Sequence, residues 1–385
     1  MYQNYFGFDR EELIEKGALN TAIEIAGQPL LWREIFEQVC ANKNELAAFL
    51  DPLLNSENLR IILTGAGSSA FLGEAAQGVF QKQTGRITQA IATTDLVTHP
   101  DLYFMRNVPT LMVSFARSGN SPESVEAVRL ANSHCSKIYH LIITCNAKGE
   151  LVRNTIGMNV FTFILPEAAN DKSLAMTGSF TSMLLAGLLM VNLSSFRAAE
   201  EKVNELSAKA KEFIEKYSTQ IEQLAGNSFE RVIFLGSGPL LGIARECHLK
   251  LQELTDGKVI CKHDSFLGLR HGPRAVINNR SLIVYLFSSD PRVFKYEMDL
   301  VQSIDDDSPD VPVVSFGRKI SGLKNDSLQI EISFSTDARE FEFILPSLFG
   351  QLLGFYRSLH LGLQPDNPSV SGNINRVVQG VTIYP

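Results

Sequence analysis

The sequence predicts an α/β protein with two doubly wound parallel sheets, each flanked by helices, behind an N-terminal helical segment. Short aliphatic runs that end in small residues alternate with helical patterns, which is typical of β-α-β units. The segment RVIFLGSGPLLGIAREC repeats the pattern of RIILTGAGSSAFLGEAA, with Gly236 following Gly65 by 171 residues (236 − 65), which indicates a duplicated domain. The length of 385 residues also exceeds what one ordinary core holds.

The first half of the chain contains the N-terminal segment and the first predicted domain. Residues 1–45 carry helical periodicity, and we expect Gln28-Pro29 to break them into two helices. Residues 46–195 form the first predicted domain, with strands in RIILTGAGSS, TLMVSFARSGNS, IYHLIITCNAKG and VFTFILPEA. The apolar stretch 180–193 is about 14 residues long, too short to span a bilayer, and predicts a buried helix.

The second half begins with a connector and then repeats the α/β pattern. Residues 196–224 predict a charged amphipathic linker helix. Residues 225–363 form the second predicted domain, with further strands in SLIVYLFSSD and VPVVSFG and a closing helix within 343–361. Residues 364–385 are rich in Asn, Pro, Ser and Gly and predict an irregular tail.

Composition and charge exclude several classes of function. The net charge is −7 and no Lys/Arg block occurs, which argues against nucleic acid or a membrane surface as the main partner. The five cysteines are scattered and neither CxxC nor HExxH occurs, so we expect no disulfide, no metal site and no cofactor. The start MYQNYFGFDREELIEKG lacks the pattern of a signal peptide, and we expect a cytoplasmic protein.

Two Gly/Ser-rich loops between a strand and a helix, 65–69 and 114–121, predict a phosphate site. Backbone N–H groups and hydroxyls gather there at the positive end of a helix. GAGSSA also satisfies the dinucleotide-binding pattern, but that interpretation needs an acid about 20 residues on, and the nearest candidate, Asp95, lies thirty residues past Gly65 (95 − 65). In the second loop, helix capping requires only Ser121 ahead of Pro122 and leaves Ser118 available.

These loops resemble those of the sugar isomerase (SIS) domain family, whose phosphate loop reads Ser-x-Ser-Gly-x-Ser/Thr. ITCNAKGELVRN, LAMTGSFTSMLLAGLLM and the second copy from about residue 231 extend the resemblance over nearly the whole chain. Their order is most similar to the tagatose-6-phosphate ketose/aldose isomerase branch, also described as galactosamine-6-phosphate deaminase/isomerase. The resemblance implies two tandem SIS domains and a bound sugar phosphate, the phosphate being held by Gly67, Ser69, Ser118 and Ser121.

The second loop departs from the family pattern at one position. Ala116 stands where synthase-type SIS proteins have the first Ser of the loop. One hydroxyl contact to the phosphate is therefore missing, and we expect the neighbouring Arg117 to compensate for it.

The catalytic candidates lie in the stretch 246–273, which begins as a helix and ends in a loop. A lone Glu253 would ordinarily be a solvated acid on a helix face. However, LKLQE followed by LRHGP resembles the LKLKE and LKHGP segments of glucosamine-6-phosphate synthase. The resemblance implies that Glu253 is the base that moves a proton between C1 and C2, that His271 opens the sugar ring and that Lys250 contacts substrate; His263 is the weaker alternative to His271. It also implies a homodimer or a dimer of dimers, because in that family the His comes from the neighbouring subunit.

The reaction follows from what the chain lacks relative to the synthase. The chain begins Met1-Tyr2 and reaches its first strand by residue 61, which leaves no room for a glutaminase domain that supplies ammonia. We therefore expect conversion of galactosamine 6-phosphate to tagatose 6-phosphate and ammonia. Plain isomerisation of tagatose 6-phosphate, the gluco epimer as substrate and a non-catalytic phosphosugar sensor remain alternatives. In the tail, Gln379 stands where the synthase has an active-site Lys.

Overall fold

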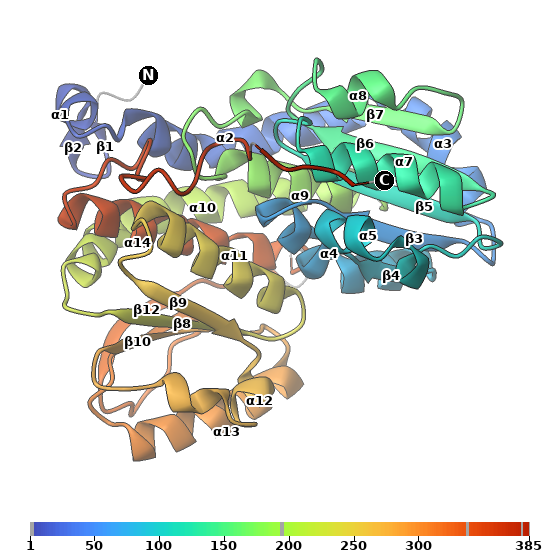
Figure 1. The fold of residues 1–385 in the computed structure, drawn as a ribbon. Coiled ribbons are helices and arrows are strands. Elements are labelled where there is room, and N and C mark those ends of the chain that lie inside the picture. The colour runs from blue at the N-terminus through green and yellow to red at the C-terminus, as the bar shows by residue number, and fades with distance from the viewer. Residues whose placement is uncertain (1–3, 193–195, 336–338, 379, 385) are drawn as a thin grey trace. The chain divides into compact units, whose positions relative to one another are not determined.

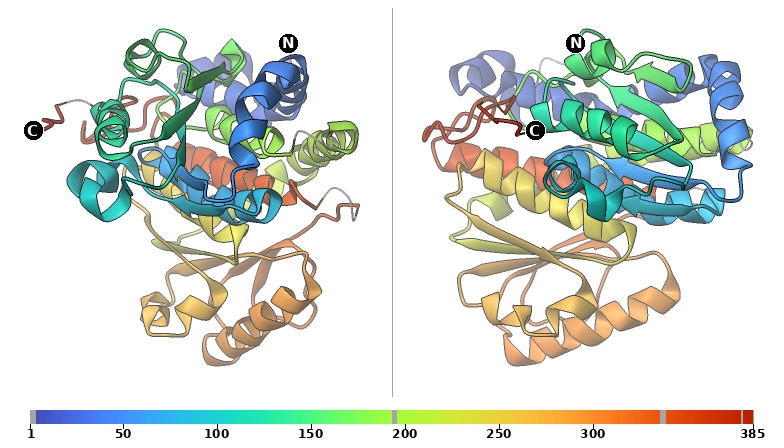
Figure 2. Two further views of the ribbon diagram at one scale, coloured as in Figure 1. Left: turned by 90° about the vertical axis from the view of Figure 1, so that its right-hand side faces the viewer. Right: turned by 45° about the vertical axis from the view of Figure 1, so that its right-hand side comes forward.

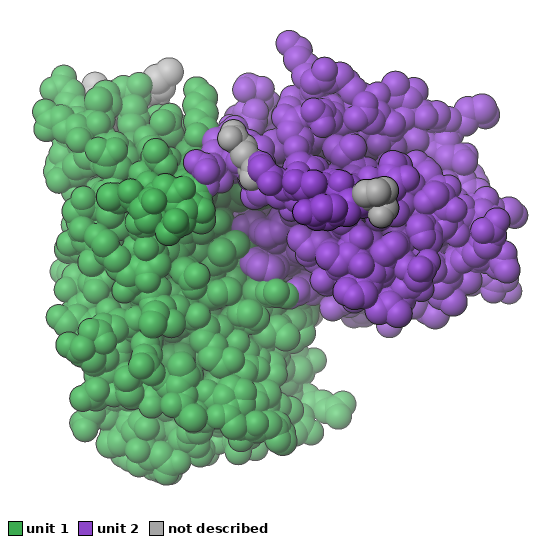
Figure 3. Space-filling view, viewed as in Figure 1, with its two compact units in different colours: residues 1–29, 172–177, 201–374 green, residues 30–171, 178–200, 375–385 purple. Residues whose placement is uncertain are grey.

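The computed structural model describes residues 4–192, 196–335, 339–378 and 380–384 and divides the chain into two compact units. Unit 1 comprises residues 1–29, 172–177 and 201–374, and unit 2 comprises residues 30–171, 178–200 and 375–385 (Figure 3). Each unit contains one parallel five-stranded sheet. The two sheets confirm the predicted fold class.

The sheet of unit 2 has the strand order β4-β3-β5-β6-β7 and is parallel throughout (Figure 1). Its strands are β3 (Arg60–Thr64), β4 (Ile87–Ala90), β5 (Thr110–Ala116), β6 (Ile138–Thr144) and β7 (Val160–Ile164). Its helices are α3 (Lys43–Leu54), α4 (Ser68–Thr84), α5 (Thr93–Thr98), α6 (Pro100–Tyr103), α7 (Pro122–His134), α8 (Glu150–Asn154) and α9 (Gly178–Met190), with a 3₁₀ turn at Glu167–Ala169.

Both faces of this sheet are covered by helices (Figure 2). Helices α4 and α9 pack on one face, where Gly73 and Gly187 let them approach the side chains of Leu63 and Phe115. Helices α5 and α7 pack on the other face in one hydrophobic cluster with Met112 and further strand residues. Because both faces are buried, the central strands are continuously apolar, which is why the sequence reveals them.

The sheet of unit 1 has the order β12-β11-β10-β8-β9 and is also parallel. Its strands are β8 (Arg231–Gly236), β9 (Ile260–Asp264), β10 (Ser281–Leu286), β11 (Val313–Gly317) and β12 (Asp326–Glu331). Its helices are α11 (Pro239–Leu254), α12 (Phe266–Leu269), α13 (Pro291–Asp307) and α14 (Pro346–His360), with 3₁₀ turns at Pro273–Val276 and Glu342–Ile344. Helices α11 and α14 pack together, and α12 and α13 share a cluster with the sheet.

The remaining elements lie near the N-terminus or run through both units. A hairpin of β1 (Asn4–Tyr5) and β2 (Phe8–Asp9) precedes α1 (Arg10–Glu15) and α2 (Leu19–Ala41). The expected linker helix is α10 (Phe196–Ala225), and the tail contains neither helix nor strand in its described residues. The buried helix expected at 180–193 is α9, although residue 193 lies outside the described part. No helix of the described residues is long and apolar enough to cross a membrane.

The expected break at Pro29 is wrong, because α2 continues through it. A proline lacks the N–H that would donate to the carbonyl four residues earlier, here Ile25. The side chain of the preceding Gln28 takes over this role, with its Nε2 donating to the Ile25 carbonyl at 3.4 Å. The Pro29 carbonyl accepts from the Ser207 hydroxyl at 2.5 Å. Side-chain hydrogen bonds from Gln28 and Ser207 thus replace part of the backbone hydrogen bonding that the helix loses at the proline.

Candidate active site

The two predicted phosphate loops lie at the same edge of the sheet in unit 2. Strands β3 and β5 are hydrogen-bonded neighbours, and Thr64 at the end of β3 pairs with Ser114. Loop 65–69 leaves β3 and residues 117–121 leave β5, so both loops begin at the carboxyl ends of adjacent strands. In doubly wound sheets this edge is where ligands bind.

The geometry of the first loop requires glycine. A Cβ on Gly65 would lie 2.5 Å from the Ser69 Cβ and 2.6 Å from the Ser69 carbonyl carbon, so no side chain fits there. Gly67 has a φ of 56° and precedes the first turn of α4. Ser68 and Ser69 are both buried in that turn. The loop therefore presents the start of a 17-residue helix at the sheet edge, where backbone N–H groups attract an anion.

The second loop is braced by its own side chains and by the loop after β6. Ser121 is the N-cap of α7 as predicted, but its hydroxyl donates to the Glu123 carboxylate at 2.6 Å instead of capping a backbone N–H. The Ser118 hydroxyl accepts from the Asn120 N–H at 3.2 Å, and the Ser118 carbonyl accepts from Asn146 Nδ2 at 2.7 Å. These contacts fix the loop before any ligand arrives.

Arg117 links the second loop to the C-terminal tail. Its side chain is only 7% exposed, and its Nη2 donates to the Arg376 carbonyl at 2.6 Å. The Arg376 side chain in turn donates to the Asp171 carbonyl at 2.9 Å and to Asn170 Oδ1 at 3.0 Å. The tail is therefore attached to the predicted phosphate loop by a contact between residues 259 positions apart.

Two buried hydroxyls near the loops had no role assigned from the sequence: Thr64 lies outside the predicted loops, and Ser114 opens the stretch 114–121 but belongs to β5. Thr64 Oγ1 and Ser114 Oγ have no hydrogen-bond partner among the described residues, although both side chains are buried. Unsatisfied buried hydroxyls are rare and often indicate a bound ligand or water. In the sequence, the only feature that marks these two residues is that each is polar in an otherwise apolar strand, Thr64 in RIILT and Ser114 in TLMVSFA.

Helix α11 of unit 1 carries Lys250 and Glu253 in direct contact. Lys250 Nζ donates to Glu253 Oε2 at 2.5 Å and lies 3.4 Å from Glu246 Oε1. Lys250 and Glu246 are 1% and 0% exposed, whereas the Glu253 side chain is 23% exposed. A buried ammonium between two carboxylates on one helix face thus holds Glu253, which keeps partial access to solvent.

The two histidine candidates differ in their surroundings. His271 follows α12, is exposed, and makes no hydrogen bond or ion pair with Glu253 within the described part of the chain. His263, on β9, contacts His248 of α11 with 3.2 Å between the two Nδ1 atoms. Burial, followed by the neighbouring His248, lowers the pKa of His263 to about 4. His263 is therefore neutral at physiological pH.

The predicted site residues fall into two groups, one in each unit. Those predicted to bind phosphate, Gly67, Ser69, Arg117, Ser118 and Ser121, belong to unit 2. The predicted catalytic residues Lys250, Glu253 and His271 belong to unit 1. Asp95, which a dinucleotide site would need at the end of a strand, lies in α5, and Gln379 lies outside the described residues. No cluster of three or more metal-binding side chains occurs among the described residues.

The fold and its Ser/Gly loops define a protein built from SIS domains, and the SIS domain family matches residues 53–193. The D-galactosamine-6-phosphate deaminase AgaS of Shewanella sp. strain ANA-3 is 39% identical over 380 residues, covering 97% of this chain and 94% of that protein. The structure of tagatose-6-phosphate ketose/aldose isomerase from Escherichia coli has a TM-score of 0.86 at 34% identity, covering 95% of this chain and 97% of that chain. A Clostridium novyi NT structure, provisionally given the same name, has a TM-score of 0.94 at 37% identity and covers both chains fully. The chain belongs to the SIS-domain sugar-phosphate family, in the branch of these deaminases and isomerases.

Proposed function

We propose that the protein is an enzyme that isomerises and deaminates an amino-sugar 6-phosphate, converting galactosamine 6-phosphate to tagatose 6-phosphate and ammonia. Its relatives in this branch carry both names, deaminase and isomerase. The observation that supports an enzyme most directly is the 2.5 Å contact between the buried Lys250 and Glu253. A protein that only sensed a sugar phosphate would need no carboxylate held in this way.

The two loops of unit 2 would bind the 6-phosphate. The N–H groups at the start of α4 and the hydroxyls of Ser69, Ser118 and Ser121 supply donors for its oxygens. Ser121 now donates to Glu123, so it would exchange that acceptor for the phosphate. Arg117 donates to the tail carbonyl of Arg376, and we propose that it orders the tail beside the phosphate in addition to contributing positive charge.

The chemistry would proceed through the open-chain sugar. His271 assists ring opening by moving the proton between the ring oxygen and the C1 hydroxyl. Glu253 then removes the proton from C2, which gives an enolamine, and returns it to C1, which leaves an imine at C2. Water adds to this imine and ammonia leaves, so that the C2 ketone of tagatose 6-phosphate remains. We propose that Lys250 positions the Glu253 carboxylate for both proton transfers.

The proposal includes an oligomer in which His271 completes the site of a neighbouring subunit. The exposure of His271 and the absence of a hydrogen bond or ion pair with Glu253 among the described residues support this arrangement. We further propose that the protein acts in the cytoplasm, where phosphorylated sugars are substrates.

The test measures ammonia and ketose release from galactosamine 6-phosphate and glucosamine 6-phosphate, and aldose formation from tagatose 6-phosphate, in parallel. Glu253→Gln keeps an oxygen acceptor for Lys250 but removes the base, and we expect kcat to fall by about 10²–10⁴-fold. Glu201→Gln, an exposed acid of α10, is the matched control and should leave kcat unchanged.

Each outcome identifies a different function. Ammonia and ketose in equal amounts from galactosamine 6-phosphate support the proposal, whereas aldose formation from tagatose 6-phosphate with no ammonia from either amino sugar would leave only an isomerase. Binding of all three sugars without turnover would make the protein a sensor. Full activity of Glu253→Gln would refute the mechanism even if the reaction were correct.

A further inference from the structure

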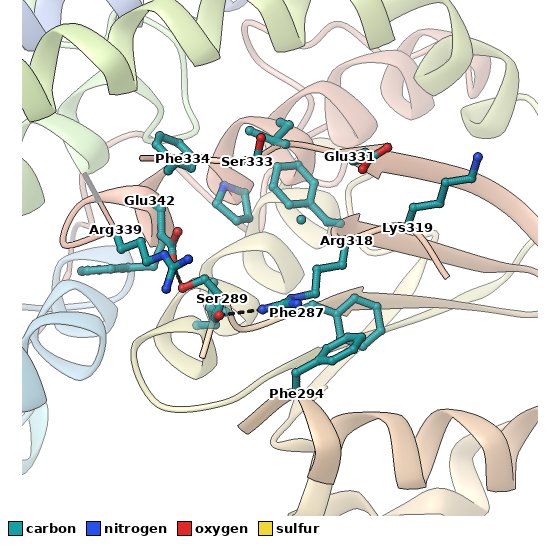
Figure 4. A pocket seen from close by; sticks show the side chains of 16 residues that line it. Phe287, Ser289, Phe294, Arg318, Lys319, Glu331, Ser333, Phe334, Arg339 and Glu342 are labelled. Carbon is teal, nitrogen blue, oxygen red and sulfur yellow. Dashed lines mark hydrogen bonds between the residues drawn. The ribbon is translucent and has the colours of Figure 1, made fainter. Parts of the chain in front are cut away.

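Unit 1 contains a cavity of about 380 Å³ at the carboxyl edge of its own sheet (Figure 4). Its lining comes from the segments that follow three parallel strands, with Ser289 after β10, Arg318 after β11 and Ser333 after β12. This is the edge that carries the phosphate loops in unit 2. The volume falls within the roughly 300–1,000 Å³ that small-molecule sites span.

In unit 1, the loop after β10, which corresponds to the predicted phosphate loop after β5, already binds a side chain of the protein itself, Glu297. Glu297 of α13 is 0% exposed and accepts from the Ser288 N–H at 3.0 Å. Burial raises its pKa, and hydrogen bonds from Ser288 and the Ser237 hydroxyl lower it. Ser237 and Ser288 follow β8 and β10, the counterparts of β3 and β5. A carboxylate of the protein itself therefore lies where unit 2 would hold phosphate, and any further anion must bind beside it.

Arg318 provides a charged group for such an anion. Its guanidinium lies 4.4 Å from the centre of the Phe294 ring and donates to the carbonyls of Ser288 at 3.1 Å and Ser289 at 2.6 Å. These two bonds fix the group in place. A guanidinium has five N–H donors, so the remaining three have no partner among the described residues.

A second guanidinium, that of Arg339, lines the same cavity and makes no hydrogen bond within the described residues. In Figure 4 the guanidinium groups of Arg318 and Arg339 both lie beside Ser289, whereas the Lys319 ammonium points away. The Ser289 hydroxyl donates to the carboxylate of Glu342, which also lines the cavity. Two guanidiniums and the carboxylates of Glu331 and Glu342 thus line one cavity, although the whole chain carries a net charge of −7.

The rest of the lining is aromatic. Five phenylalanines border the cavity, and with Leu240 and Pro346 they supply its apolar part: Phe287, Phe294, Phe316, Phe334 and Phe343. Aromatic faces pack against the C–H face of a sugar, guanidiniums pair with phosphate, and carboxylate and hydroxyl oxygens bind sugar hydroxyls. The three kinds of group that a phosphorylated sugar needs are therefore present together.

We propose that this cavity is a second binding site for a phosphorylated sugar, separate from the site at the loops of unit 2. Arg318 and Arg339 hold the phosphate, Glu342 and Ser289 bind hydroxyls, and the aromatic side chains pack against the carbon skeleton. The site has no part in the proposed reaction, since it lacks a counterpart of Glu253. It gives the protein a place to sense the level of a sugar phosphate while another is turned over.

The experiment counts bound ligand on the full chain by isothermal titration calorimetry and equilibrium dialysis. The probe is galactitol 6-phosphate, which has no carbonyl and cannot be isomerised, with inorganic phosphate and galactitol as comparison ligands. We expect two equivalents of probe per wild-type chain and one for Ser69→Ala/Ser118→Ala. Arg318→Gln and Arg339→Gln should each weaken the second site by about ten- to a hundredfold, since each removes charge-assisted hydrogen bonds.

Controls separate the second site from folding and from the proposed function. Arg280→Gln removes an exposed charge directly ahead of β10, at the opposite edge of the sheet, and should keep both equivalents. Arg339 is exposed and makes no hydrogen bond among the described residues, so Arg339→Gln should fold even if Arg318→Gln does not. One equivalent on the wild-type chain would overturn the second site and leave the proposed enzyme intact. Two equivalents that survive Arg339→Gln unweakened would also overturn it, and phosphate binding as tightly as the probe would exclude a sugar site.

Discussion

The buried Lys250 offers the sharpest test of how the carboxylate of Glu253, the proposed base, is held. Lys250→Met keeps the length and much of the volume of the side chain but removes the ammonium that lies 3.4 Å from Glu246 and 2.5 Å from Glu253. Because Glu246 is fully buried, the substitution removes a cation from beside a carboxylate in the protein interior. Breaking a buried ion pair in this way costs about 3–5 kcal/mol.

This loss of stability should give a measurable decrease in the melting temperature. A chain of 385 residues unfolds with an entropy of about 0.8 kcal/mol/K at about 2.1 cal/mol/K per residue. The loss should therefore lower Tm by about 4–6 °C in differential scanning calorimetry, with ammonia release measured on the same preparation. We also expect kcat to fall at least about tenfold, because the Glu253 carboxylate loses the donor that orients it.

A second substitution separates stability from positioning. Adding Glu246→Gln replaces the buried carboxylate beside the missing ammonium by a neutral amide, so the double variant should recover most of the lost Tm. It should not recover kcat, since Glu253 still lacks its partner. A Tm within 1 °C of wild type for Lys250→Met would refute the buried-charge argument. Recovery of activity together with stability would refute the positioning role of Lys250.

Three further predictions concern the phosphate loop, pH and the tail. Gly65→Ala places a Cβ 2.5 Å from Ser69 and should raise KM for the sugar phosphate at least about tenfold, whereas Gly78→Ala, with open space around it, should leave KM unchanged. Burial lowers the pKa of His140 to about 4 from 6.5, so the unfolded chain binds a proton at higher pH than the folded chain. The free energy of unfolding should therefore fall by up to about 1.4 kcal/mol per pH unit as the pH drops from 6.5 to 4. Urea titrations at pH 7 and pH 5 should show that His140→Gln loses less of this free energy than the wild type. Arg117→Gln removes the bond to the tail carbonyl and should speed proteolysis of the C-terminus several-fold, and an unchanged rate would show that other contacts retain the tail.

The sequence reveals the central strands of both sheets but not most of the edge strands. Strands β3, β5 and β8 are buried on both faces and read as uninterrupted apolar runs. In the two five-stranded sheets, the strands that the sequence did not predict are β4, β9 and β12, and all three lie at sheet edges. Their sequences ITQA, ICKHD and DSLQIE mix polar and apolar residues, because an edge strand is only partly covered. A short, half-exposed strand leaves little hydrophobic pattern to find.

For the candidate site, too, the sequence predicts contacts between residues that are close in the chain but not those between distant residues. Ser121 ahead of Pro122 is a local capping pattern, and the structure places it where the sequence predicts. The bond between Arg117 and the Arg376 carbonyl joins residues 259 positions apart, and no spacing rule anticipates it. The contact between Lys250 and Glu253, in contrast, follows from their spacing of three on one helix.

The division of the chain has a consequence for how the duplicated domains fold. The chain passes from one unit to the other at residues 29/30, 171/172, 177/178, 200/201 and 374/375, and two of these passages lie within α2 and α10. A fragment that ends between the two sequence copies would contain Thr21 and Gln28 without Asp366 and Gln351, their hydrogen-bond partners in unit 1. Residues of the N-terminal segment are therefore part of unit 1 although they precede both sequence copies, and we expect a fragment that ends between the copies to be less soluble than the intact chain.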